Sequence, residues 1–243
     1  MTGSVEFAWA RLSARQSRRP APPDWHRIEA LRSLAAVIDA TRGGALAAWV
    51  AGVDPIAGPH EIEALLRTRW HERVDEVARW MPPAWQPAVA WWAVLPDLPV
   101  IAALARGMPL PAPVADAYQD LLHGPPAHDS RWAPLAPAWG GVSTVANAWT
   151  AEWRRRLPCE PDAALTALER AVVAHVRAFA STAPGSGTPL RVALAARLDA
   201  LFRRATAAPA AAFVFLAQCL LDGERIRGEL LRRAALPRAA LAA

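Results

Sequence analysis

The stretch His60–Met81, HEIEALLRTRWHERVDEVARWM, is the clearest indicator of the fold class of this chain. Its apolar residues recur every three or four positions, and charged residues fill most of the positions between them. This spacing is typical of an amphipathic helix that buries one face. The sequence therefore predicts a long helix whose inward stripe consists of Ile62, Leu65, Leu66, Trp70, Val74, Val77 and Trp80.

The remainder of the chain has the same helical character. Alanine, leucine, arginine and glutamate dominate, alternating strand-like runs are lacking, and 23 prolines mark the breaks. The predicted fold class is therefore all-α and multi-helical. Further helices are expected over Val5–Arg18, from the cap residue Asp24 through Ile38, and over Ala84–Leu95, Val100–Ala105, Val114–Leu122, Ala148–Arg156, Asp162–Ala180, Leu190–Ala205 and Pro209–Ala235.

Proline and glycine crowd the middle of the chain, between Met108 and Asn147. Such a density disfavours long helices and predicts an irregular connection between two helical lobes that pack together. The predicted organisation is an N-terminal helical lobe over 1–107, a Pro/Gly-rich connection over 108–147 and a C-terminal helical lobe over 148–243. A second, flexible link is expected over Ser181–Pro189.

Charge, cysteines and apolar runs narrow the classes of protein to consider. The formal net charge of +5 is small and scattered, so no nucleic-acid partner is expected. Cys159 and Cys219 lie far apart and match no metal or redox spacing, which predicts two reduced thiols. The polar N-terminus lacks the apolar core of a secretory signal. The apolar run Ala210–Leu221 is shorter than the ~20 residues that span a bilayer, so any membrane association is expected to be peripheral.

No reactive constellation stands out in the sequence. The chain contains no GxxxxGK[ST] phosphate loop, no GxGxxG, no GxSxG and no HExxH motif. His123, His128 and Asp129 lie close together in a Pro/Gly-rich stretch, but a metal site needs a further partner at fixed geometry. Most carboxylates lie beside arginines, as solvated pairs do. We therefore predict no enzyme activity, no catalytic residue, no metal and no cofactor.

Two arginine clusters are the candidate partner-binding residues, because arginine makes bidentate contacts with acidic partners or lipid headgroups. The alternative is that they serve solubility alone. The clusters are Arg11, Arg15, Arg18 and Arg19, and Arg154, Arg155 and Arg156.

The 12 tryptophans are a second feature of note. Trp70, Trp80, Trp91 and Trp92 fall on inward helical stripes and are expected in the core. Those that flank the connection either hold it in place or form a contact surface, since tryptophan is enriched in binding hot spots. They are Trp132, Trp139, Trp149 and Trp153.

One segment in the N-terminal half resembles a known family. It begins with Phe7–Arg15, FAWARLSAR, and continues through Glu29–Leu31 and the start of the long helix at Glu61–Leu66. It ends with Leu95–Gly107, LPDLPVIAALARG. These stretches are similar, in the same order, to the V-type/A-type ATPase protein that joins the central stalk to the membrane ring, here called the stalk–ring linker family.

A second segment, Ala211–Leu241, resembles the C-terminal tail of the stalk–ring linker family. An apolar helix leads into Gly223–Arg233, GERIRGELLRR, which is followed by Leu236 and Pro237. Together the two segments cover more than half of the chain, which looks like a shortened bacterial member in which the middle helical pseudo-repeat is reduced to the proline-rich connection.

The resemblance implies a mechanical function. In that family a helical protein connects the central stalk to the membrane ring of proteolipids and transmits torque for proton or ion transport. The expected partners are therefore the central-stalk proteins and the proteolipid ring, and the expected location is the cytoplasmic face of the inner membrane, with peripheral attachment through the ring. The alternatives are a stand-alone helical scaffold or adapter and, more distantly, a helical protein that binds a small molecule in a tryptophan-lined pocket.

Overall fold

The computed structural model describes residues 3–110, 116–180, 182 and 186–235. In this part the protein is all-α, as predicted: 72% of the chain is helical, with 11 α-helices and no strand. The α-helices are α1 (Val5–Gln16), α2 (Pro22–Ala30), α3 (Leu34–Thr41), α4 (Ala47–Val50), α5 (Pro59–Trp80), α6 (Gln86–Ala90), α7 (Leu98–Ala105), α9 (Val145–Arg156), α10 (Ala163–Ala180), α11 (Thr188–Arg204) and α12 (Ala210–Ala235). The short 3₁₀ helices are η1 (Pro83–Trp85), η2 (Trp91–Asp97), η3 (Asp116–Leu121) and η4 (Ala133–Ala138).

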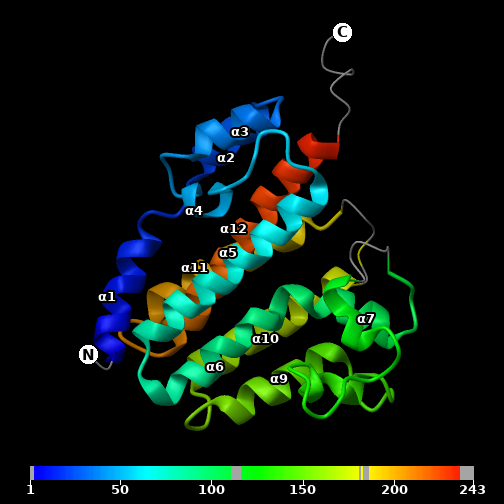
Figure 1. The fold of residues 1–243 in the computed structure, drawn as a ribbon. Helices are drawn as coiled ribbons and strands as arrows, with labels where there is room; N and C mark the ends of the chain where they lie inside the picture. Colours follow the sequence, from blue (N-terminus) through cyan, green and yellow to red (C-terminus); the bar gives the residue numbers. More distant parts are fainter. Residues whose placement is uncertain (1–2, 111–115, 181, 183–185, 236–243) are drawn as a thin grey trace.

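Helices α5 and α12 form the centre of the molecule and run side by side (Figure 1). Helix α5 begins where predicted: the Glu61 carboxylate accepts a hydrogen bond from the Gly58 amide at 2.8 Å, which caps the first turn. Its apolar stripe faces inward, with Leu65 only partly buried. Residues 210–219 of α12 are all buried, because this helix is surrounded by α5, α1, α3, α10 and α11.

Aromatic packing joins α9 to the centre. The Trp92 ring lies edge-on to the rings of Trp149 and Trp153, at centroid distances of 5.7 and 6.1 Å. Phe213 of α12 packs against Trp92 and Trp153 at 5.7 and 5.3 Å. Edge-to-face contacts of this kind add to the stabilisation from burial. The structure thus confirms the core assignment of Trp92 and assigns Trp149 and Trp153 to packing.

The proline-rich connection is short-helical and packs on the molecule. Tyr118 in η3 and Trp132, just before η4, are buried, and their ring centroids lie 6.1 Å apart. The expected helix Val114–Leu122 is described only from residue 116 onward, as the 3₁₀ helix η3. Residues 111–115, and most of the predicted Ser181–Pro189 link, lie outside the described residues.

The hydrophobic core is continuous across the predicted lobe boundary. Buried residues from 1–107, from the connection and from 148–243 belong to one cluster. Helix α12 contacts α5 and α3 as well as α10 and α11. The division into two lobes built as pseudo-repeats therefore stays a prediction, and the described helices share one interior.

Two predicted helices are broken. The expected helix from Asp24 to Ile38 is two helices, α2 and α3, because Ser33 caps α3 by accepting a hydrogen bond from the Ala36 amide at 3.2 Å. Asp24 lies in the first turn of α2 instead of before it, and its carboxylate binds the Ala21 amide. The expected helix Ala84–Leu95 is a series of short α and 3₁₀ turns that continues into α7.

One helical stretch has the length and apolar composition of a membrane span, and it is not the apolar run Ala210–Leu221 that is conspicuous in the sequence. This stretch, Pro83–Ala105, has a mean hydropathy of 1.7 over its most apolar window, half of which is buried in the protein. A buried core helix meets the same test, so these properties by themselves indicate no membrane insertion.

Candidate functional site

The arginines in and just after α1 divide into internal and outward-facing ones. Arg19 binds both carboxylate oxygens of Asp222 on α12, at 2.8 and 3.0 Å, and reaches Asp199 on α11 at 3.4 Å. Arg15 pairs with Glu76 of α5 at 2.6 Å. These two predicted partner-binding residues serve to attach α1 to its neighbours.

The other two arginines of this cluster face solvent. Arg11 is exposed and lies over the Phe7 ring, 5.1 Å from its centroid, while Phe7 itself is 41% exposed. Arg18 is also exposed and follows the end of α1. Within the described part of the chain, neither forms an ion pair, so their guanidinium groups are available to an acidic surface.

The α9 arginines bind carboxylates of the protein itself. Arg155 and Arg156 both bind Glu152, at 2.7 and 2.6 Å, and their hydrogen bonds lower the pKa of this carboxyl, although burial opposes that effect. Arg154 binds both oxygens of Glu169 on α10. Arg155 nevertheless keeps 71% of its side chain exposed, so a partner could still contact it.

Ion pairs that the sequence did not indicate join the two segments that carry the family resemblance. Arg225 of α12 binds Glu29 of α2 and lies over the Trp25 ring. Arg227 of α12 binds Glu63 of α5 through both Nε and Nη2. No signal in a single sequence identifies such pairs, because the partners lie 196 and 164 positions apart.

Arg233, near the end of α12, makes the most buried of these contacts, with an exposed fraction of 5%. Its guanidinium donates to the carbonyl oxygens of Ile28 and Leu31, each 2.9 Å away, and to the Glu229 carboxylate at 2.6 Å. The C-terminal carbonyls of α2, which have no partner within their own helix, are satisfied in this way.

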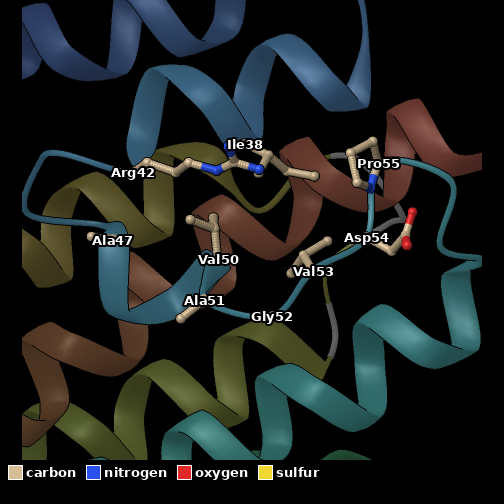
Figure 2. Close-up of a pocket in the computed structure, with 9 residues that line it drawn as sticks. All are labelled: Ile38, Arg42, Ala47, Val50, Ala51, Gly52, Val53, Asp54 and Pro55. Carbon is tan, nitrogen blue, oxygen red and sulfur yellow. The ribbon is translucent and has the colours of Figure 1, made fainter.

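A surface hollow of about 540 Å³ lies beside the loop between α4 and α5 (Figure 2). Its charged groups are Arg42 and Asp54, which lie at opposite sides of the hollow. Arg42 is paired with Asp39 at 3.2 Å, and the Asp54 carboxylate accepts a hydrogen bond from the Ile56 amide at 2.8 Å. The remaining lining is small, mostly apolar and free of tryptophan, so the tryptophan-pocket alternative gains no support here.

His123, His128 and Asp129 are exposed in the structure. Among the described residues, no group of three or more His, Cys, Asp or Glu side chains is arranged to hold a metal ion.

A buried carboxylate lies within the motif Leu95–Gly107. Asp97 is 4% exposed and accepts a hydrogen bond of 2.6 Å from the Tyr118 hydroxyl. Arg67 lies 3.7 Å from the same carboxylate and over the Tyr118 ring. Burial first, and the negative charge of Asp97 second, raise the pKa of Tyr118 well above its ordinary value.

We expect Tyr118 to stay protonated at pH values where a free tyrosine ionises. Since it is the only tyrosine of the chain, tyrosinate absorbance during an alkaline titration reports this residue alone. The folded protein keeps the proton and the unfolded chain releases it near pH 10, so stability should fall as the pH rises above about 10. Replacing Asp97 by asparagine should move the ionisation to lower pH; an unchanged titration would contradict the role of Asp97.

Comparison with known proteins returns no match: no family model, no curated protein and no solved structure is significantly similar to this chain.

Proposed function

We propose that this protein is a non-catalytic linker that couples the central stalk of a V-type/A-type ATPase to its membrane proteolipid ring. The proposal starts from the resemblance of two segments, Phe7–Gly107 and Ala211–Leu241, to the stalk–ring linker family. In this function the protein binds two partners and performs no chemistry. Rigid helices with a charged surface suit that task, because torque is transmitted through packing and shape.

The observation that supports the proposal most is the pairing between the two segments. Arg227 binds Glu63, Arg225 binds Glu29, and Arg233 binds the Leu31 carbonyl. Each of these residues belongs to one of the two segments on which the resemblance rests, and each pair joins the N-terminal segment to the C-terminal one. The segments therefore form one structural unit, as expected if they derive from one ancestral protein.

The exposed arginines Arg11 and Arg18 are the proposed contacts with acidic partner surfaces. They lack internal ion pairs among the described residues, whereas Arg15 and Arg19 are engaged. Interfaces that depend on such cations weaken as salt screens their charges. Association with the ATPase should accordingly be strongest at low ionic strength.

Affinity purification from the native locus tests the proposal. A tagged protein should capture central-stalk proteins and the ring at low salt, and loss of the gene should abolish ion- or proton-coupled turnover while the detached soluble head still hydrolyses ATP. The double variant Arg11→Glu/Arg18→Glu should reduce capture about tenfold or more. Arg27→Glu/Arg32→Glu, a matched pair of exposed sites on the α2 side, should have little effect.

Failure to capture any component of the ATPase at low salt would reject the linker function and leave the stand-alone scaffold or adapter as the better description. Equal effects of the two double variants would instead reject the assigned contact surface, and the linker function would stand.

A further inference from the structure

Helix α1 rests on the molecule through a mostly polar interface. Only Ala8 and Leu12 of this helix are buried apolar residues, supplemented by Trp9, whose ring stacks on Phe202 of α11 at 5.2 Å. The α5–α12 interface, in contrast, is built on the long apolar faces of both helices. The apolar burial that attaches α1 is therefore small, and other contacts must hold it in place.

Those other contacts are charged. Arg19 is the main one: its side chain is 19% exposed and bridges Asp222 on α12 to Asp199 on α11. Gln218 extends the network by donating to Asp199 at 2.7 Å. Arg15 binds Glu76, which Arg73 binds in turn at 2.6 Å.

Several polar atoms in this region have no partner among the described residues. On α1 these are the buried Ser13 Oγ and Gln16 Oε1, and on α12 the buried Gln218 Oε1. A buried acceptor without a hydrogen bond costs free energy that water would recover. Exposure of these atoms therefore offsets part of the loss when α1 separates from α12.

We propose that α1 is a releasable clasp, which opens as a unit while α5 and α12 stay folded and thereby uncovers the polar face of α12. The proposal does not depend on the ATPase function. When α1 leaves, the side chains of Glu76, Asp199 and Asp222 lose their partners Arg15 and Arg19 and form an acidic surface. That surface fits a helix with two arginines four positions apart, the spacing of Arg15 and Arg19 themselves.

The two cysteines provide a built-in assay for this opening. Cys219 is buried, lies among Arg73, Asp222, Arg19 and Glu76, and has a thiol pKa that burial raises to about 12. Cys159 is exposed and serves as an internal reference. A thiol reagent should label Cys159 rapidly and Cys219 only when the clasp opens.

The test measures the labelling rate of both cysteines in the full-length protein by mass spectrometry. Opening of one helix exposes little surface, so the Cys219 rate should depend only weakly on urea below the unfolding transition. It should also rise with added sodium chloride, which screens the Arg19 contacts. Labelling of Cys219 with the same steep urea dependence as global unfolding would overturn the proposal.

Variants give an independent test. Arg19→Met should accelerate labelling of Cys219 about tenfold or more, because it removes the main contact and leaves two carboxylates unpaired. Arg227→Met removes an ion pair between α12 and α5 that does not involve α1, so it controls for general destabilisation. Equal acceleration by the two variants would contradict the clasp. If Arg19→Met does not fold, the urea dependence of the natural protein still decides.

Discussion

Replacement of Arg233 by methionine is expected to lower the free energy of unfolding by about 3–5 kcal/mol. The substitution keeps most of the side-chain volume but removes every donor. The carbonyl oxygens of Ile28 and Leu31 and the Glu229 carboxylate then lose a partner in a region that water reaches poorly. The loss of a charged hydrogen-bond donor costs more than the gain from an apolar side chain offsets.

The neighbouring Arg232 supplies the matched control. Its side chain is 54% exposed and binds the same Glu229 at 2.9 Å. Arg232→Met should therefore cost less than about 1 kcal/mol. Urea denaturation of both variants measures the difference, and hydrogen exchange should show α2 losing protection in Arg233→Met alone. Similar losses of stability in the two variants would show that the contacts with α2 contribute little.

Replacement of Gly223 by alanine should destabilise the protein by about 1–3 kcal/mol, although alanine is the better helix former by ~1 kcal/mol. Gly223 lies within α12, where Trp49 of α4 packs against its backbone. A Cβ at this position would lie 2.7 Å from Trp49 Cη2 and 3.0 Å from Cζ2. The buried ring must shift to accept the methyl group, and this overpacking outweighs the gain in helix propensity.

Gly228 of the same helix tests the sign of this argument. A Cβ there meets nothing within 4 Å, and the residue is exposed. Gly228→Ala should stabilise the protein by up to about 1 kcal/mol, since only the propensity term remains. Thermal or urea unfolding should thus move in opposite directions for the two substitutions. A stabilised Gly223→Ala would mean that Trp49 repacks without cost.

Several features of the fold could be predicted because they depend on residues close together in the chain. The spacing of Ile62, Leu66, Trp70 and Val74 predicts both the helix and its buried face. The break between α2 and α3 could not be predicted in this way, because an apolar pattern compatible with one helix continues across it. A local serine cap, Ser33, starts the second helix instead.

The roles of the candidate arginines could not be predicted, since a run of basic residues reads the same whether it faces solvent or a carboxylate. Arg15 and Arg19 lie near Arg11 and Arg18 in the sequence, yet the first two bind carboxylates of α5, α11 and α12 and the last two face outward. The partner of a guanidinium group depends on which helix packs beside it.

Side-chain periodicity and backbone chemistry act over a few residues, so the helical class, the buried faces of the long helices and the proline breaks can be recognised in the chain alone. The pairing of Arg19 with Asp222, 203 positions away, and of Arg233 with the end of α2 depends on the folded arrangement. Such contacts arise because helix packing brings distant segments together, and no local pattern encodes the partner.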